Sequence, residues 1–255
     1  DSSTTSIDYL VRNNGVLNVN GATTRSITVQ SGSTLNINGA SIVGSSGAEG
    51  VVVTSSRGTI DRANVTSEDI GLAVNRSSVA AGGSDVTVSN SQIEGEVAGA
   101  QVTGLSKLSL INTQVTGAAG DGIGVNILGG EVDASAGTHI TGQATGVRMV
   151  NDSANVGARA LTLDNAIVQG VNGSAVLVER GTNATIRLSN GASLLAGNNI
   201  LLDVQGASTA AMTVANSALQ GNVNIDGSSV ANLTFDQGHF TGDVVLVDDA
   251  SSATV

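Results

Sequence analysis

The sequence predicts an all-β fold: a right-handed parallel β-helix (solenoid) of about ten coils, forming a single domain over residues 1–255. Three observations predict it. A degenerate ten-residue pattern recurs along the chain, its apolar residues alternate with the period of a β-strand, and Gly and Asn recur at the breaks between strands. Together they describe one short supersecondary unit that is stacked many times.

The repeated pattern reads apolar, any, apolar, any, Asn or Gly, small, any, apolar, any, Gly. Clear copies are residues 35–44, 86–95, 108–117 and 212–221, and a weaker one at residues 17–24 extends the array to about ten coils. The last apolar residue of each copy serves as a marker, and successive markers are 21 to 28 residues apart, a spacing typical of solenoids. The markers are Ile42, Val65, Ile93, Val115, Ile140, Val168, Leu195, Leu219 and Phe240.

A second short apolar segment follows each of several copies, as at residues 50–53, 71–74, 122–125 and 146–149. Such short alternation, broken by Gly or Asn, is typical of strands and turns. A short strand with one apolar face cannot bury that face alone. Stacked coils, at about 4.8 Å per layer, place equivalent positions above one another and so form continuous aliphatic columns. Gly and Asn suit the turns because both tolerate a positive φ.

Composition agrees with this fold and excludes several classes of function. The chain has no Pro, which suits a chain that is almost entirely paired strand and tight turn. It has no Cys, which excludes disulfides and thiolate metal sites, and no apolar stretch approaches the roughly 20 residues of a membrane span. The net charge of −11, with few and scattered basic residues, argues against nucleic acid and anionic lipid as partners.

The repeat and three local stretches resemble the passenger domains of classical bacterial autotransporters of the pertactin-like type. The stretches are residues 137–149, 175–190 and 233–244. The resemblance implies a virulence-associated stalk that is displayed at the bacterial cell surface or secreted. It also implies that the signal peptide, further C-terminal coils and the translocator lie outside this sequence. The implied partners are a host-surface or neighbouring-cell protein or glycan, a C-terminal outer-membrane barrel of the same protein, and other copies along the stalk.

Two departures from that family bear on function. Arg57-Gly58 and Arg180-Gly181 are each followed by Thr, so no Arg-Gly-Asp sequence supports integrin binding. No insertion is long enough for an enzymatic subdomain, and only residues 75–85 and 149–160 leave room for modest protruding loops. We expect residues 1–14 to cap the N-terminal end.

The two histidines do not predict a catalytic centre. His139 and His239 each precede a marker and are four coils apart, about 19 Å at the spacing of stacked strands. They cannot share a metal ion, and we expect each at an outward or turn position. A Ser-His-Asp set is not signalled either, because no Gly-x-Ser-x-Gly elbow is present. Four aspartates lie in or near the same coils: Asp121, Asp133, Asp236 and Asp243.

Carbohydrate chemistry is the alternative, as in a phage tailspike or a polysaccharide-degrading enzyme. Glycosidases need two carboxylates about 5 to 10 Å apart. The candidate pairs are Glu94 with Glu96, Glu68 with Asp69, and Asp248 with Asp249. The shortage of aromatic side chains, which would stack on sugars, argues against this alternative. The only aromatic residues are Tyr9, Phe235 and Phe240.

The prediction is therefore a non-enzymatic adhesin or virulence-associated passenger. We expect a stiff stalk about 50 Å long, from ten stacked layers, that carries no cofactor, no metal and no catalytic residue. The single Gly-Asp-Gly run at residues 120–122 is too little for a calcium-binding β-roll, which repeats its motif in every coil. The sequence assigns no individual binding residues.

Overall fold

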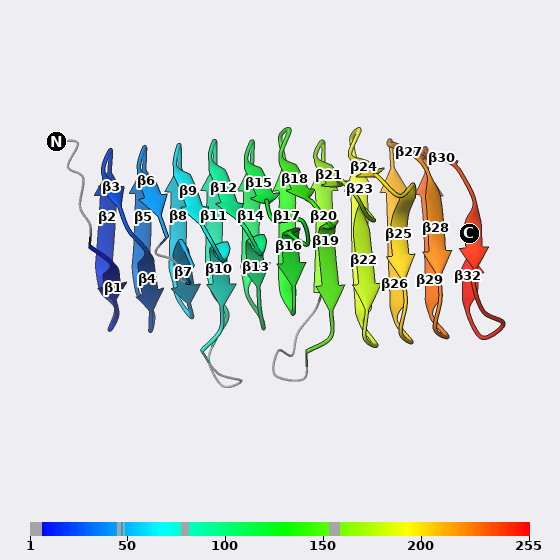
Figure 1. Cartoon of the computed structure of the whole chain (residues 1–255), viewed down its shortest axis with the longest axis horizontal. Helices are drawn as coiled ribbons and strands as arrows, with labels where there is room; N and C mark the ends of the chain where they lie inside the picture. The colour runs from blue at the N-terminus through cyan, green and yellow to red at the C-terminus, as the bar shows by residue number, and fades with distance from the viewer. Residues whose placement is uncertain (1–6, 45–46, 48, 78–81, 153–158) are drawn as a thin grey trace.

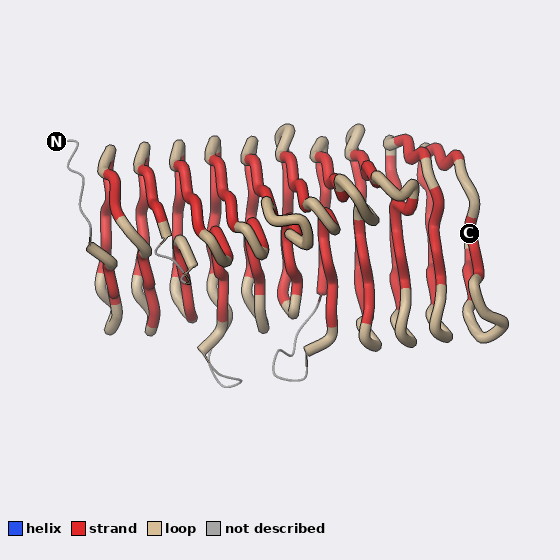
Figure 2. Tube along the Cα trace, viewed as in Figure 1, coloured by secondary structure: helices blue, strands red, loops and turns tan. Residues whose placement is uncertain are grey.

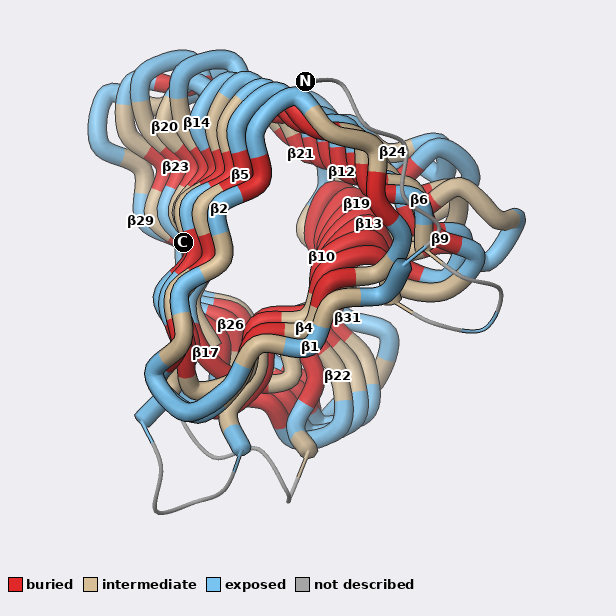
Figure 3. Tube along the Cα trace, turned by 90° about the vertical axis from the view of Figure 1, so that its left-hand side faces the viewer, coloured by how far each residue is buried: buried red, intermediate tan, exposed pale blue. Residues whose placement is uncertain are grey.

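The computed structural model describes residues 7–44, 47, 49–77, 82–152 and 159–255, and it is a parallel β-helix. The coils stack along one long axis from the N-terminal end to the C-terminal strands (Figure 1). Each coil consists of strands joined by short turns, and no helix occurs in the described ranges (Figure 2). Viewed along the axis, the chain winds right-handedly (Figure 3). The predicted fold class is confirmed.

Two parallel sheets run from the first coil to the last, and a third runs from β3 to β24. Sheet I consists of β1 (Tyr9–Val11), β4 (Ile27–Gln30), β7 (Val51–Thr54), β10 (Ile70–Asn75), β13 (Ala98–Val102), β16 (Ile123–Ile127), β19 (Thr145–Val150), β22 (Val176–Glu179), β25 (Ile200–Val204), β28 (Asn222–Ile225) and β31 (Val244–Leu246). Sheet II consists of β2 (Val16–Asn20), β5 (Thr34–Asn38), β8 (Arg57–Asp61), β11 (Asp85–Ser89), β14 (Lys107–Ile111), β17 (Gly130–Ser135), β20 (Arg159–Asp164), β23 (Asn183–Ser189), β26 (Thr209–Ala215), β29 (Val230–Asp236) and β32 (Ser252–Thr254). Sheet III consists of β3 (Thr23–Thr24), β6 (Ser41–Val43), β9 (Asn64–Ser67), β12 (Gln92–Gly95), β15 (Gln114–Gly117), β18 (His139–Gly142), β21 (Ile167–Gly170) and β24 (Ser193–Ala196), and a separate pair consists of β27 (Ala218–Gln220) and β30 (His239–Thr241).

Aliphatic columns fill the interior, as the alternating pattern predicts. In sheet III, Ile93 of β12 lies in register between Val65 and Val115, and all three are almost fully buried. Sheets I and II contribute equivalent columns, so the core is continuous along the axis (Figure 3). Each layer buries its apolar face mainly against the layers on either side of it.

One marker was wrong. Val168 pairs in register with Leu194, which is 2% exposed, whereas Leu195 is 45% exposed and points outward. Two adjacent leucines both fit the degenerate pattern, and only the pairing of β21 with β24 decides between them. Of the predicted cap, residues 1–6 lie outside the described residues, and Tyr9–Val11 form β1, the first strand of sheet I, in register with β4.

The corner between sheets II and III explains the repeated Asn and Gly. The residue after each sheet II strand has a positive φ in most coils, for example 49° at Asn90 and 48° at Asn112. Its N–H continues the ladder to the next coil, as from Asn90 to the Ile111 carbonyl (3.0 Å). Residues other than Asn and Gly also occur at this position: Arg62 and Gln237 adopt the same conformation, with φ of 49° and 52°.

Two glycine columns form the corner between sheets III and I, where backbones approach most closely. One column ends the sheet III strands and the other lies near the start of the sheet I strands. A methyl group on Gly142 would lie 1.8 Å from the Thr145 carbonyl oxygen and 2.6 Å from the Gly124 nitrogen. Only glycine fits that spacing, because a methyl group here would overlap neighbouring backbone atoms.

Sheet II widens toward the C-terminal end. Its strands have five residues in β5, β8, β11 and β14 but seven in β23, β26 and β29. The added inward position is filled by a buried alanine in each wide strand: Ala184, Ala210 and Ala231.

Parts of both predicted loops, residues 78–81 and 153–158, lie outside the described residues. Across the described ranges, no helix is long and apolar enough to cross a membrane.

Candidate functional site

A polar groove runs along the outer side of sheet III. Outward side chains of successive strands form one column there, in which Asn64, Gln92, Gln114 and His139 are direct register neighbours. Strand alternation places these residues outward because the following residue in each strand, such as Ile93, faces the core. The groove thus presents three amides and an imidazole in consecutive layers.

Two depressions with shared walls make up this groove, which we call the amide groove. The first, of about 210 Å³, is lined by Asn90, Ser91, Gln92, Asn112, Thr113, Gln114, Gly137 and His139. The second, of about 380 Å³, is lined by Gly21, Ala22, Thr23, Gly39, Ala40, Ser41, Arg62, Ala63, Asn64, Asn90 and Gln92. Because Asn90 and Gln92 line both, the amide groove is continuous from β3 to β18.

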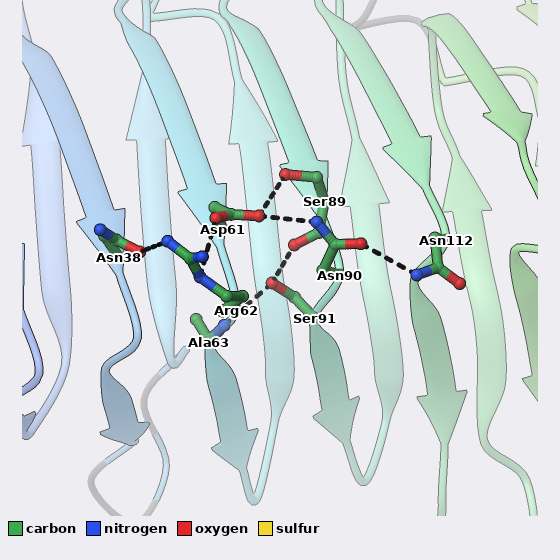
Figure 4. Close-up of polar contacts among 8 residues, drawn as sticks. All are labelled: Asn38, Asp61, Arg62, Ala63, Ser89, Asn90, Ser91 and Asn112. Atoms are coloured by element: carbon green, nitrogen blue, oxygen red, sulfur yellow. Dashed lines mark hydrogen bonds and ion pairs between the residues drawn. The ribbon is translucent and has the colours of Figure 1, made fainter.

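A hydrogen-bond network fixes the wall of the amide groove at the corner between sheets II and III (Figure 4). The Asn112 amide donates to Asn90 Oδ1 (2.9 Å), and the Asn90 amide donates to Asp61 Oδ1 (2.9 Å). Ser89 Oγ donates to the same carboxylate oxygen (2.8 Å). Arg62, which follows Asp61 in the same coil, donates from its guanidinium to Asn38 Oδ1 of the preceding coil (2.6 Å). The side chains along this wall are therefore held by one another across four coils.

Asp61 is the carboxylate of that network, and Arg62 is its cation. Hydrogen bonds from Asn90 and Ser89, and the nearby Arg62 guanidinium, hold the pKa of the Asp61 carboxyl below its usual value. The carboxylate is therefore ionised at neutral pH and ion-paired with Arg62 (3.1 Å). The rest of the groove consists mainly of neutral amides and hydroxyls, groups that donate and accept hydrogen bonds at once.

The two histidines lie on different elements. His139 begins β18 and lines the amide groove, whereas His239 begins β30 in register with Ala218. Both are exposed outward residues. Asp133 lies on the outer side of sheet II, where it pairs with Lys107 (2.7 Å), so it does not orient His139. Asp121, Asp236 and Asp243 are exposed, and Asp236 ends β29.

The register groups the candidate carboxylates differently from the sequence. Glu94 and Glu96 are both exposed on or just after β12, and Glu68 and Asp69 follow β9. The Glu96 N–H donates to the Ser67 carbonyl (3.1 Å), which places Glu68 and Glu96 at equivalent positions in adjacent coils. Asp248 accepts the N–H groups of Ser228 (3.1 Å) and Ala250 (2.8 Å), so it closes a turn. None of these carboxylates lines the amide groove.

The aromatic side chains pack toward the core instead of forming a binding platform. Phe235 and Phe240 stack with ring centroids 5.8 Å apart at the C-terminal end. Tyr9 is partly buried against the core at the N-terminal end. Among the described residues, no group of three His, Asp or Glu side chains is arranged to hold a metal ion.

Composition concealed two further polar arrangements. Buried hydroxyls form a column at the corner between sheets I and II, where Ser56 Oγ accepts the Ser33 N–H (3.1 Å) and Ser84 Oγ accepts the Ser56 N–H (3.2 Å). These serines satisfy backbone donors and are structural. Two of the basic residues also lie together, because Arg148 and Arg180 both contact the Glu179 carboxylate.

Comparisons with known proteins give no independent indication of function. A scan against protein-family models, a search of curated proteins and a search of solved structures each found no match. The amide groove and the register of its side chains are therefore the basis for a functional assignment.

Proposed function

We propose that this chain is a non-enzymatic binding stalk, the passenger domain of a pertactin-like bacterial autotransporter. In this proposal a C-terminal outer-membrane barrel of the same protein exports the stalk, which stands at the cell surface or is secreted. It attaches the cell to a host surface or to a neighbouring cell. The stacked parallel coils support a rigid, elongated spacer, and the net charge of −11 limits nonspecific attachment to other anionic surfaces.

The observation that carries this proposal is the amide groove. Apart from Arg62, the polar side chains that line it are amides, hydroxyls and one imidazole, and the outward amides recur in successive layers, so they match a ligand that offers hydroxyl and amide groups at regular intervals. A neutral glycan chain has this chemistry. Protein partners are usually anchored by buried aromatic or Arg side chains in the interface, whereas amides, hydroxyls and one imidazole line most of this groove.

The test is glycan binding by the purified chain and by variants of the groove. We expect neutral oligosaccharides to bind, and the double variant Gln92→Ala with Gln114→Ala to bind about tenfold more weakly, because each lost hydrogen bond costs about 0.5–1.5 kcal/mol. The control is Gln169→Ala, which removes an outward amide from the same sheet beyond the groove. Unchanged affinity in the double variant, or no binding of any neutral glycan, would contradict the proposal.

The second candidate is cleavage of a glycan, and one observation favours it. Glu68 and Glu96 occupy equivalent positions in adjacent coils, a separation of about 4.8 Å between layers, close to that of the two carboxyls of a retaining glycosidase. Both side chains are exposed and lie outside the amide groove. If bound glycans are shortened on incubation, and Glu68→Gln and Glu96→Gln each abolish that shortening, the enzyme replaces the stalk as the conclusion.

A further inference from the structure

A column of alternating charge lies on the outer side of sheet II. Arg57, Asp85, Lys107 and Glu131 begin or nearly begin β8, β11, β14 and β17, and each is the direct register partner of the next. These four strands lie side by side (Figure 1). Arg57, Asp85 and Glu131 are exposed, and the Lys107 side chain is 45% exposed. We call these four residues the charge column.

The two ends of the charge column form no ion pair within the described part of the chain. Lys107 pairs with Asp133 (2.7 Å), and that contact, with the nearby charges of Glu131 and Asp85, raises the pKa of Lys107. Arg57 and Glu131 form no ion pair with any residue in the described ranges, and they are separated by the two intervening coils. Two opposite charges on one face thus lie too far apart to meet each other.

Two-fold symmetry would pair them between two molecules. In an isologous dimer, a patch packs against the same patch of the other copy. If the two-fold axis runs along the strands between β11 and β14, the long axes become antiparallel and the order of coils is reversed. Arg57 then faces Glu131 of the second copy, and Asp85 faces Lys107 of the second copy. All four interchain pairs have opposite charge.

We propose that sheet II, centred on the charge column, is the surface on which a second copy of this chain docks with its long axis antiparallel. The occupant is assigned by charge complementarity, because an alternating column of even length complements itself only when its direction is reversed. If the two long axes were parallel and the two columns were aligned residue for residue, each charged side chain would face the identical side chain of the second copy. The inference goes beyond the binding of a ligand in the amide groove and does not depend on it.

The neighbouring column of sheet II agrees with this arrangement. It consists of Thr59, Thr87, Ser109 and Asp133 in the same four strands. Under the same symmetry, the Thr59 hydroxyl faces Asp133 of the second copy and can donate to it, and Thr87 faces Ser109 of the second copy. No like charges are brought together in either column.

The size of the patch predicts a weak, salt-dependent dimer. Four layers of five-residue strands cover roughly 20 Å by 17 Å, which is below the area of a standard stable interface. Exposed ion pairs contribute little individually and are screened by salt. We therefore expect association that increases with concentration and decreases as ionic strength rises.

Charge exchange at the two ends of the column tests the pairing. By sedimentation equilibrium of the whole chain, we expect Arg57→Glu and Glu131→Arg each to weaken dimerisation at least tenfold, because like charges then face each other. The double variant Arg57→Glu with Glu131→Arg should restore dimerisation, because the exchanged charges are again opposite. Arg25→Glu and Glu94→Arg are the controls, since both change charge off sheet II.

Orientation is tested with single cysteines, which the cysteine-free chain allows. Three layers separate positions 57 and 131, about 14 Å, too far for a disulfide within one chain. An oxidised mixture of the Arg57→Cys and Glu131→Cys variants should give a covalent heterodimer, whereas each variant alone should not cross-link.

Three results would overturn the inference. They are a wild-type chain that stays monomeric at every concentration and low salt, a double variant that fails to regain dimerisation, and self-cross-linking of either single-cysteine variant in preference to the mixture. Variants of the amide groove should dimerise normally, and variants of the charge column should keep glycan affinity, so failure of one proposal is distinguishable from failure of the other. Unchanged thermal unfolding of each variant confirms that the fold is retained.

Discussion

At the scale of single residues, the closest backbone contacts depend on glycine. Gly142→Ala would place a methyl group 1.8 Å from the Thr145 carbonyl oxygen, so backbone must move. We expect a loss of unfolding free energy of about 1–3 kcal/mol or more, as for other overpacked sites. Gly120→Ala is the matched control because nothing lies within 4 Å of the added methyl. Urea denaturation measures both, and equal stability of the two variants would contradict the close packing of this corner.

One carboxylate makes stability depend on pH. The N–H groups of Ser228 and Ala250 bind Asp248 and lower its pKa to about 2 from 3.8. Because the folded pKa is the lower one, the stabilisation is present above about pH 4 and is lost as pH falls through about 2. We expect Asp248→Asn to lower the melting temperature at pH 7, and the difference from wild type to shrink between pH 4 and 2. The control is Asp249→Asn, and a difference independent of pH would contradict this assignment.

At the scale of strands, the inward and outward positions of β12 differ sharply. Ile93 is 1% exposed between Val65 and Val115, so Ile93→Asp both removes an aliphatic group and buries a carboxyl. We expect a loss of about 4 kcal/mol or more, whereas Gln92→Asp, on the outward side, should stay within about 0.5 kcal/mol. Hydrogen exchange should show lost protection in β9, β12 and β15 first, because layers contact mainly their neighbours. Similar losses in both variants would disprove the register.

The sequence was sufficient to predict the strands, their parallel stacking and the nature of the corners. Alternation places Ile93 inward, and the need for a positive φ explains Asn90 and Asn112. It was insufficient at Leu194 and Leu195, because both are apolar and a shift of one residue reverses which side faces the core. That choice is made by hydrogen bonds between coils, which no local pattern contains.

The candidate site was not predicted, although the repeat carried its signal. Gln92, Gln114 and His139 each directly precede a marker of the repeat, which places them at equivalent positions of successive coils. Strand pairing confirms that register, but the groove beside the column depends on the corner residues of neighbouring coils, which the pattern does not place in space. Arg57 and Glu131 looked scattered along the chain until the register placed them at the two ends of the charge column. Composition limits which side chains are available for binding, and the register of the strands determines where they lie.

At the scale of the whole molecule, the direction of the backbone hydrogen bonds has a mechanical consequence. In all three sheets these bonds join one coil to the next, so they run along the long axis. A pull along that axis, as on a stalk held at one end and bound at the groove, loads all the bonds between two coils together. A pull on the chain itself instead peels one coil at a time and releases roughly 80 Å of extended chain per coil of about 25 residues. The same ladder thus resists stretching under a distributed load and yields one coil per step when it is unwound from an end.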